Sequence, residues 1–326
     1  MSGRRGKDPG VTAVAWLGLA LTGMAAIVWG AETFAEHLAT ASARLGVSTF
    51  ALALLLAGAE PEELATSVTA SLRNAPTIAL GDVIGANVAI CCLALGAAAL
   101  IAPLPFGHAV RPYAWAGIPA GGLAAALAWD GTVNRIEGVV LTSAYVAFVV
   151  VIWRLERHPP TLGETGELDE PHPEGRIGIE LGLVVAGVTA MAVGSVALVE
   201  GVRRVSGAET TQGRLGLVVV GLATSFELVV LAWSSARRGI TTAVVAAVVG
   251  SFTYNVTMTL GAGALARPLR ITDPALLRGP WIAMLGALTL ALALSARSRT
   301  LSRRAGIVLI AGYPAFVALA LTSTRS

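Results

Sequence analysis

Apolar runs of about 20 residues, separated by short polar segments, occupy most of the chain. A helix of that length crosses the roughly 30 Å hydrocarbon core of a bilayer. The pattern therefore predicts an all-α integral membrane protein with about ten transmembrane helices. The expected helices cover residues 11–30, 47–72, 77–102, 114–129, 138–154, 177–199, 215–236, 241–266, 280–296 and 306–322. An amphipathic extension that carries Glu32 and Glu36 leaves open a longer first helix.

Two of these runs, the second and the seventh, are interrupted near their middle by polar residues. The second run is broken at Gly58–Glu63 (GAEPEE) and the seventh at Ala223–Glu227 (ATSFE). A charge at the centre of a bilayer costs from about 3 to over 10 kcal/mol, so acidic residues there usually serve a function. A helix broken in the membrane also leaves backbone polar groups that must line a cavity or bind a polar partner. The interruptions therefore predict a polar site at mid-membrane.

The two halves of the chain repeat each other. A shift of 165 residues superposes Gly58 on Ala223, Glu62 on Glu227, Arg73 on Arg238, Thr77 on Thr242, Gly85 on Gly250 and Gly96 on Gly261. A second block, GVVLTSAYVAFV from Gly138, matches GIVLIAGYPAFV from Gly306. The expected organisation is a first repeat at 1–154, an acidic linker rich in Pro and Gly at 155–176, and a second repeat at 177–326. Five spans per repeat make the two repeats inverted, as in many secondary transporters.

Inversion suggests a shared site between the repeats. The two interruptions would meet near the centre of the membrane, with Glu62 and Glu227 facing each other across a pseudo-two-fold axis. Carboxylates and backbone carbonyls are hard oxygen ligands that suit Ca²⁺ and can also accept Na⁺ or protons. A secondary antiporter is thus favoured over a cation channel or uniporter. A membrane-embedded hydrolase is not supported, because neither HExxH nor GxSxG occurs.

Composition agrees with a multi-pass protein of the cell membrane. The 326 residues are 55% hydrophobic and 13% charged, with a mean hydropathy of +0.73, which is more apolar surface than a soluble core of this size could bury. The net charge of +3 comes from arginines at segment ends, where membrane proteins meet lipid headgroups. The predicted partners are therefore the lipid bilayer and the transported cations, with no nucleic acid and no cofactor. The balance of Arg and Lys does not orient the chain, and nothing indicates an oligomeric state.

The cysteines and histidines carry no metal-site pattern. Cys91 and Cys92 are adjacent in an apolar run and cannot pair with each other without strain, so we expect them to act as small hydrophobic residues. The four histidines have no metal-ligand spacing and are expected to be solvated near the membrane ends; they are His37, His108, His158 and His172.

The interrupted runs resemble the signature repeats of the cation/calcium antiporter family, G-T-S-x-P-E-L followed by G-x-x-x-G-S-N-x-x-N. Here the first repeat reads AGAEPEELATS from Ala57 and ALGDVIGANVAI from Ala79, and the second reads GLATSFELVV from Gly221 and VVGSFTYN from Val248. The resemblance to the prokaryotic sodium/calcium exchanger type spans nearly the whole chain. It implies exchange of Ca²⁺, or a related cation, for Na⁺ by alternating access, in which helices 1 and 6 slide over the other helices.

The residues of the two motifs and their neighbouring acids form the candidate cation site. The cation-binding candidates are Glu62, Glu227, Glu63, Asn87, Thr224, Ser251 and Asn255, with Glu62 and Glu227 as the metal ligands. Glu60 and Asp82 are the candidate additional acids, and like Glu63 they have no counterpart in the family motif.

Departures from the family pattern leave two questions open. Gly58 and Ala59 stand where the family has Thr-Ser, so hydroxyl ligands are fewer, while acids are more numerous. Burial and mutual repulsion favour the protonated form of a carboxylate, so proton-coupled exchange is the alternative to sodium coupling. Glu62 and Glu63 are both candidates for the first-repeat ligand, and the ungapped self-match favours Glu62.

Overall fold

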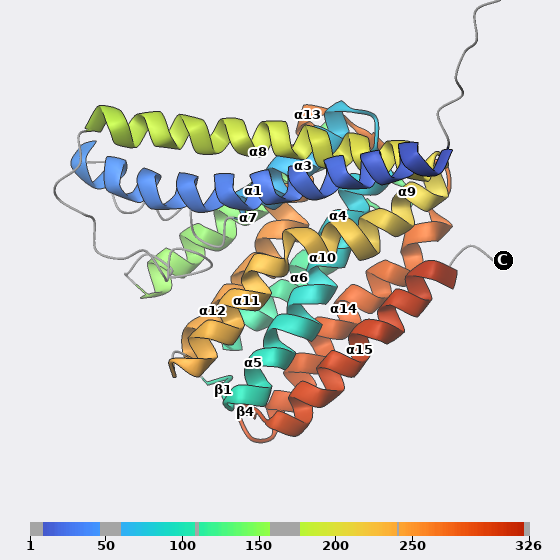
Figure 1. The fold of residues 1–326 in the computed structure, drawn as a ribbon. Helices are drawn as coiled ribbons and strands as arrows, with labels where there is room; N and C mark the ends of the chain where they lie inside the picture. Colours follow the sequence, from blue (N-terminus) through green and yellow to red (C-terminus); the bar gives the residue numbers. More distant parts are fainter. Residues whose placement is uncertain (1–8, 46–59, 108–110, 157–176, 240, 323–326) are drawn as a thin grey trace, which may run out of the picture.

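The computed structural model describes residues 9–45, 60–107, 111–156, 177–239 and 241–322. Within these ranges the chain is mainly helical, with four two-residue strands and short turns between the elements (Figure 1). The first half contains α1 (Pro9–Leu45), α3 (Pro61–Leu72), α4 (Pro76–Ala89), a π-helical segment η1 (Ile90–Ala94), α5 (Leu95–Ile101), β1 (Leu104–Pro105), α6 (Arg111–Leu127), β2 (Thr132–Val133) and α7 (Arg135–Glu156). The second half contains α8 (Ile177–Ser206), α9 (Glu209–Leu215), η3 (Gly216–Val220), α10 (Gly221–Thr224), α11 (Phe226–Arg237), α12 (Thr241–Tyr254), η4 (Asn255–Thr259), α13 (Leu260–Ala266), β3 (Leu269–Arg270), α14 (Ala275–Ala296), β4 (Thr300–Leu301) and α15 (Arg303–Thr322).

The helices have the length and apolar character of membrane spans, which confirms the predicted fold class. Eight helical stretches in the described residues are long and apolar enough to cross a bilayer, and Ala114–Leu127 is a shorter apolar helix. The second expected span is described only from residue 60 onward, so its first half lies outside the described residues. Most of the expected linker, 157–176, lies outside them as well.

The inverted repeat is visible in the element bounds and in the strand pairing. η1, α5 and β1 recur 165 residues later as η4, α13 and β3, with the same lengths. The strands pair reciprocally between the halves: β1 is antiparallel to β4, with Leu104 opposite Leu301, and β2 is antiparallel to β3, with Val133 opposite Leu269. Each of the two small sheets is therefore made of one strand from each repeat.

The first and sixth predicted helices, α1 and α8, form an antiparallel pair that crosses the remaining bundle (Figure 1). Glycines hold their backbones close together. A Cβ added at Gly23 would lie 2.6 Å from the Gly194 carbonyl oxygen, and one added at Gly30 would lie 2.7 Å from that of Gly187. Small residues of this kind permit close helix approach in membranes.

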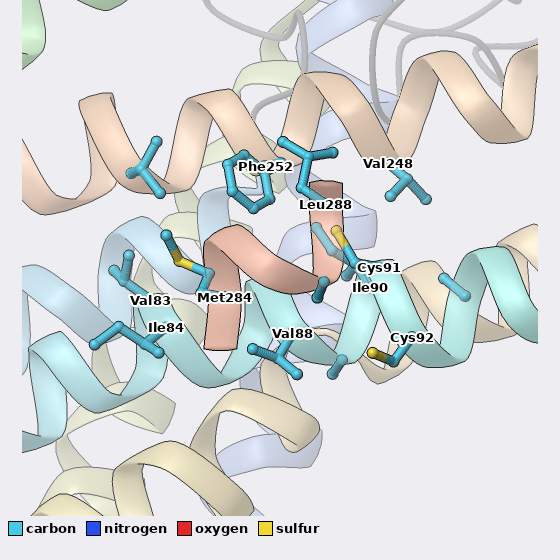
Figure 2. Packing of buried hydrophobic residues seen from close by; sticks show 14 of the residues in the cluster. Val83, Ile84, Val88, Ile90, Cys91, Cys92, Val248, Phe252, Met284 and Leu288 are labelled. Carbon is cyan, nitrogen blue, oxygen red and sulfur yellow. The ribbon is translucent and has the colours of Figure 1, made fainter. Parts of the chain in front are cut away.

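The centre of the bundle is formed by α4, η1 and α5 (Figure 2). Val83, Ile84 and Val88 pack there with Met284 and Leu288 of α14. Cys91 and Cys92 are free and buried in the same hydrophobic cluster, as expected for small hydrophobic residues.

Close packing between the repeats predicts a large cost for enlarging Gly85 of α4. A Cβ at this position would lie 2.1 Å from the Leu217 carbonyl oxygen, a backbone atom that cannot move aside cheaply. Overpacking of this kind typically costs about 1–3 kcal/mol. We therefore expect Gly85→Ala to lower the unfolding temperature in detergent. Gly286→Ala on α14 is the matched control, because nothing lies within 4 Å of its Cβ position. Equal unfolding temperatures for both variants would contradict the packing described here.

Several helix ends differ from the predicted ones; the seventh helix, for example, begins at Glu209 rather than at residue 215. α8 continues beyond the expected end at Val199 to Ser206, because Arg203 and Arg204 pair with Glu200 at i+3 and i+4 spacing. α14 begins at Ala275 rather than at Pro280, which lies inside the helix; the side chain of Asp273 accepts the N–H of Ala275 at the helix start, at 3.1 Å. α1 takes the longer alternative and continues to Leu45.

α7 begins three residues earlier than predicted, because a capping box sets its start. The Asn134 side chain accepts the backbone N–H groups of Ile136 and Glu137, and Glu137 accepts the N–H of Asn134 at 2.7 Å. In the preceding turn the N–H and hydroxyl of Thr132 donate to Asp130, and these bonds lower the pKa of that exposed carboxyl.

Candidate cation site

The seventh predicted helix is interrupted at Ser225, inside the stretch that the sequence singled out. α10 ends at Thr224 and α11 begins at Phe226. The Ser225 hydroxyl donates to the Gly221 carbonyl at 2.7 Å, which satisfies part of the broken helix end. Glu227 lies half-buried in the first turn of α11, where the positive end of the helix dipole favours a carboxylate.

The first-repeat interruption ends at Pro61, where α3 begins. Residues 46–59, including Gly58 and Ala59, lie outside the described residues. Pro61 occupies the first helical turn, where its missing N–H costs nothing. Glu62 and Glu63 follow in the same turn, and both are buried. Glu62 in α3 and Glu227 in α11 therefore occupy the same place in equivalent helices.

Three acids of the first repeat gather in the interior. Glu60, Glu63 and Asp82 are 3%, 0% and 0% exposed. The carboxyl groups of Glu60 and Glu63 are in contact, and Glu63 also lies within electrostatic reach of Asp82 and Glu62. In the described part of the chain no arginine forms an ion pair with any of the three. Buried acids without a basic partner are unfavourable unless protons or cations neutralise them.

Polar side chains of the second repeat meet these acids. The Thr224 hydroxyl donates to Asp82 Oδ1 at 2.8 Å, and Asn255 Nδ2 donates to Glu60 Oε2 at 3.4 Å. Asn255 Nδ2 also lies 3.4 Å from Ser251 Oγ. Both carboxylate contacts run from one repeat to the other, so the polar cluster lies between the repeats.

Asn87 belongs to the same interior. It lies on α4, five residues after Asp82, and is 0% exposed. Neither atom of its amide group, nor Asp82 Oδ2, has a hydrogen-bond partner among the described residues. Buried polar atoms are nearly always paired in folded proteins, so the two oxygens are suited to a bound cation or water, and the amide nitrogen, which is a donor, is suited to water.

Glu62 and Glu63 point along different faces of α3. Glu63 shares its face with Ser67, four residues on, whose hydroxyl donates to the Thr259 carbonyl of η4 at 3.2 Å. Glu62 shares its face with Arg73, eleven residues on, whose guanidinium contacts Glu200 of α8. Glu63 is thus directed toward the central helices, and Glu62 lies within electrostatic reach of Glu63 and of Tyr254, the last residue of α12. That Glu62 and Glu227 face each other stays a prediction.

Sequence reasoning missed the π-helical segments that carry part of this cluster. Asn255 opens η4, where Thr259 donates to its Oδ1 at 3.4 Å. The equivalent η1 occupies the same place in the first repeat. π-segments frequently mark functional sites, but the hydrophobic pattern of a π-turn does not differ from that of an α-helix over five residues.

The donor set favours a mixed oxygen site. Among the described residues, no three His, Cys, Asp or Glu side chains converge as a ready metal-ligand set. A cation held here must also take neutral oxygens from residues such as Asn87, Thr224 and Ser251. Mixed carboxylate, carbonyl and amide ligation is typical of Ca²⁺.

His37, which we expected to be solvated, instead contacts α8. Its Nδ1 lies 2.7 Å from Glu180 Oε2, and its side chain is 22% exposed. The prediction was wrong because α1 continues well beyond the first apolar run and keeps His37 against α8. The other three histidines lie outside the described residues.

Comparisons with known proteins agree over most of the chain. The family described as sodium/calcium exchanger protein matches residues 15–154 and 179–322. The inner membrane protein YrbG of Escherichia coli is 24% identical over 314 residues, covering 92% of this chain and 95% of that protein. The sodium/calcium exchanger MaX1 of Methanosarcina acetivorans is 38% identical over 86 residues, which cover 26% of this chain and 25% of that protein.

Solved structures show the same fold. The sodium-calcium exchanger NCX_Mj, in a structure soaked with Na⁺ and Sr²⁺, superposes with a TM-score of 0.59 at 22% identity, covering 94% of this chain and 98% of that chain. The family match spans both repeats and includes every described residue of the polar cluster. The chain is therefore a multi-pass membrane protein of the cation antiporter class and belongs to the sodium/calcium exchanger protein family.

Proposed function

We propose that the protein exchanges Ca²⁺, or a related cation, for Na⁺ by alternating access. In this proposal Glu62 and Glu227 are the ligands of the transported metal ion. The other proposed ligands are Glu63, Asn87, Thr224, Ser251 and Asn255. The observation that carries the proposal is the pair of contacts Thr224 to Asp82 and Asn255 to Glu60, which join acids of one repeat to polar groups of the other. A cation bound there would contact both repeats and respond to their relative movement.

The named relatives support the choice of ions. MaX1 is named a sodium/calcium exchanger, and NCX_Mj was studied with Na⁺, Ca²⁺ and Sr²⁺. The mixed oxygen set of this chain also suits Ca²⁺ better than softer metals. We expect the transported ions, and no resident cofactor, to occupy the site.

A second candidate is proton-coupled exchange, which the gathering of Glu60, Glu63 and Asp82 favours. Three buried acids without an arginine partner can release protons when a divalent cation enters and bind them again when it leaves. These acids would bind Na⁺ with less specificity than the family motif does, because the Thr and Ser hydroxyls of that motif are replaced here by Gly58 and Ala59.

Flux in proteoliposomes distinguishes the two coupling ions. Purified protein is reconstituted, and uptake of radioactive Ca²⁺ is followed under an outward Na⁺ gradient, an outward H⁺ gradient, or neither. We expect the Na⁺ gradient to drive accumulation at constant pH. Accumulation under the pH gradient alone would replace sodium coupling with proton coupling. If neither gradient moves Ca²⁺, the same assay with Sr²⁺, Mn²⁺ and Mg²⁺ tests the related cations, and no flux of any of them would refute the proposal.

A further inference from the structure

The second half of each interrupted helix ends at an arginine outside the polar cluster. Arg73 is the C-cap residue of α3 and Arg238 that of α11. Each is followed by a residue in the left-handed region, Asn74 with φ 56° and Gly239 with φ 81°. This shared ending makes the two arginines structurally equivalent. Because the repeats are inverted, they lie at opposite faces of the membrane.

α1 and α8 carry a matching pair of glutamates. Glu36 follows Gly30 of α1 by six residues, and Glu200 follows Gly194 of α8 by six residues. A shift of 164 residues superposes both the glycines and the glutamates. Since these glycines occupy equivalent contacts between α1 and α8, the glutamates are equivalent as well. The chain therefore contains two symmetry-related combinations, Arg73 with Glu200 and Arg238 with Glu36.

The two combinations differ in the structure, because one of them, Arg73 with Glu200, forms an ion pair. Arg73 Nη1 lies 3.3 Å from Glu200 Oε2, and α8 packs along α3. Among the described residues α1 makes no comparable contact with α11, which lies away from it in Figure 1. The side chains of Glu36 and Arg238 are both exposed. The bundle is thus asymmetric although its sequence positions are paired.

We propose that these residues form alternative ion pairs that set the side of the membrane toward which the transporter opens. Exchanging the conformations of two inverted repeats generates the opposite-facing state. In that state α1 packs along α11 as α8 now packs along α3, so Glu36 pairs with Arg238 and the contact between Arg73 and Glu200 is lost. The inference rests on the proposed antiport and deepens it. The four side chains act as positioning residues, because the one contact described between them, that of Arg73 with Glu200, lies outside the polar cluster.

The exposure of the Arg73 and Glu200 side chains sets how strongly their ion pair shifts the equilibrium between the two states. The Arg73 and Glu200 side chains are 38% and 19% exposed, and partly exposed ion pairs shift an equilibrium by about two- to fivefold. Arg203 and Arg204 also contact Glu200, but they lie on the same helix and move with it. Of the three arginine contacts described for Glu200, the one with Arg73 is therefore the one that differs between the two states.

Cysteine cross-linking in the full chain tests the exchange of pairs. The variants Arg73→Cys/Glu200→Cys and Glu36→Cys/Arg238→Cys are reconstituted in liposomes and treated with a short bis-methanethiosulfonate; the parent chain, with Cys91 and Cys92 buried, serves as the blank. We expect both pairs to cross-link, and each link to stop exchange until a reductant is added. Adding Arg73→Gln to the Glu36→Cys/Arg238→Cys variant should raise its cross-linking rate about two- to fivefold.

Arg237→Gln is the matched control, because Arg237 is exposed beside Arg238 but corresponds to Leu72 in the other repeat. It should leave the cross-linking rate unchanged. A Glu36→Cys/Arg238→Cys variant that transports but never cross-links would overturn the inference, and so would equal effects of Arg73→Gln and Arg237→Gln. Cross-linking does not require flux, so a switch between pairs in a protein without cation flux would support the inference while refuting the proposed function.

Discussion

Glu62→Gln is expected to reduce Ca²⁺ flux in proteoliposomes by about 30-fold or more, and Glu227→Gln to do the same. Each substitution keeps the size of the side chain and removes one of the two acids that occupy equivalent turns of α3 and α11. Truncating one partner of a buried charge interaction costs about 2–5 kcal/mol, which corresponds to at least a 30-fold loss of affinity. Initial rates at low Ca²⁺ concentration measure the effect.

Glu32→Gln provides the control for charge and folding. Glu32 is an exposed acid on α1, so its neutralisation should leave the flux within about twofold of the parent, as for most surface substitutions. Circular dichroism and gel filtration in detergent check that all three variants remain folded. Parent-like flux in either Glu62→Gln or Glu227→Gln would remove that residue from the site, and Glu63→Gln would then test the neighbouring acid.

Thr224→Val is expected to lower the apparent Ca²⁺ affinity by about tenfold, the second largest effect. The substitution keeps the shape of the side chain and removes the hydroxyl that donates to Asp82 at 2.8 Å. Loss of a hydrogen bond to a buried charged group costs about 1.5–3 kcal/mol. The measurement is the concentration dependence of initial Ca²⁺ uptake.

Ser225→Ala is the matched control for Thr224→Val. Ser225 is the next residue and is equally buried, but the bonds described for its hydroxyl go to carbonyls of its own helix, those of Gly221 and Leu222. Its loss should therefore leave the apparent affinity within about twofold of the parent, because such local bonds do not support helix structure strongly. A Thr224→Val variant that behaves like Ser225→Ala would show that the bridge to Asp82 has no role in binding.

Much of the fold could be predicted from the sequence because the repeat supplied two independent copies of each feature. The break in the seventh helix was placed within two residues of Ser225 by the polar interruption and by its match to the first repeat. The equal places of Glu62 and Glu227 in α3 and α11 follow from the same ungapped shift. Such features depend on local composition and on residue order, both of which are visible in one sequence.

The contacts between repeats could not be predicted, because they depend on how helices cross. Asp82 was an acid without an assigned partner until α4 was seen to cross α10, where Thr224 donates to it. Glu60 similarly gained a partner in Asn255 through the π-helical segment η4, which rotates this residue relative to a regular helix. The contact of His37 with Glu180 likewise arises from the register of α1 against α8.

Exchange of labelled for unlabelled Ca²⁺ across proteoliposome membranes tests whether the protein is an antiporter, because this exchange requires antiport and does not depend on the coupling ion. Vesicles are prepared with or without internal Ca²⁺, in buffers free of Na⁺ and at equal pH, and uptake of external radioactive Ca²⁺ is measured. We expect rapid uptake only into vesicles that contain Ca²⁺, and its loss in Glu62→Gln. Equal uptake into vesicles with and without internal Ca²⁺ would contradict exchange and indicate a channel or uniporter.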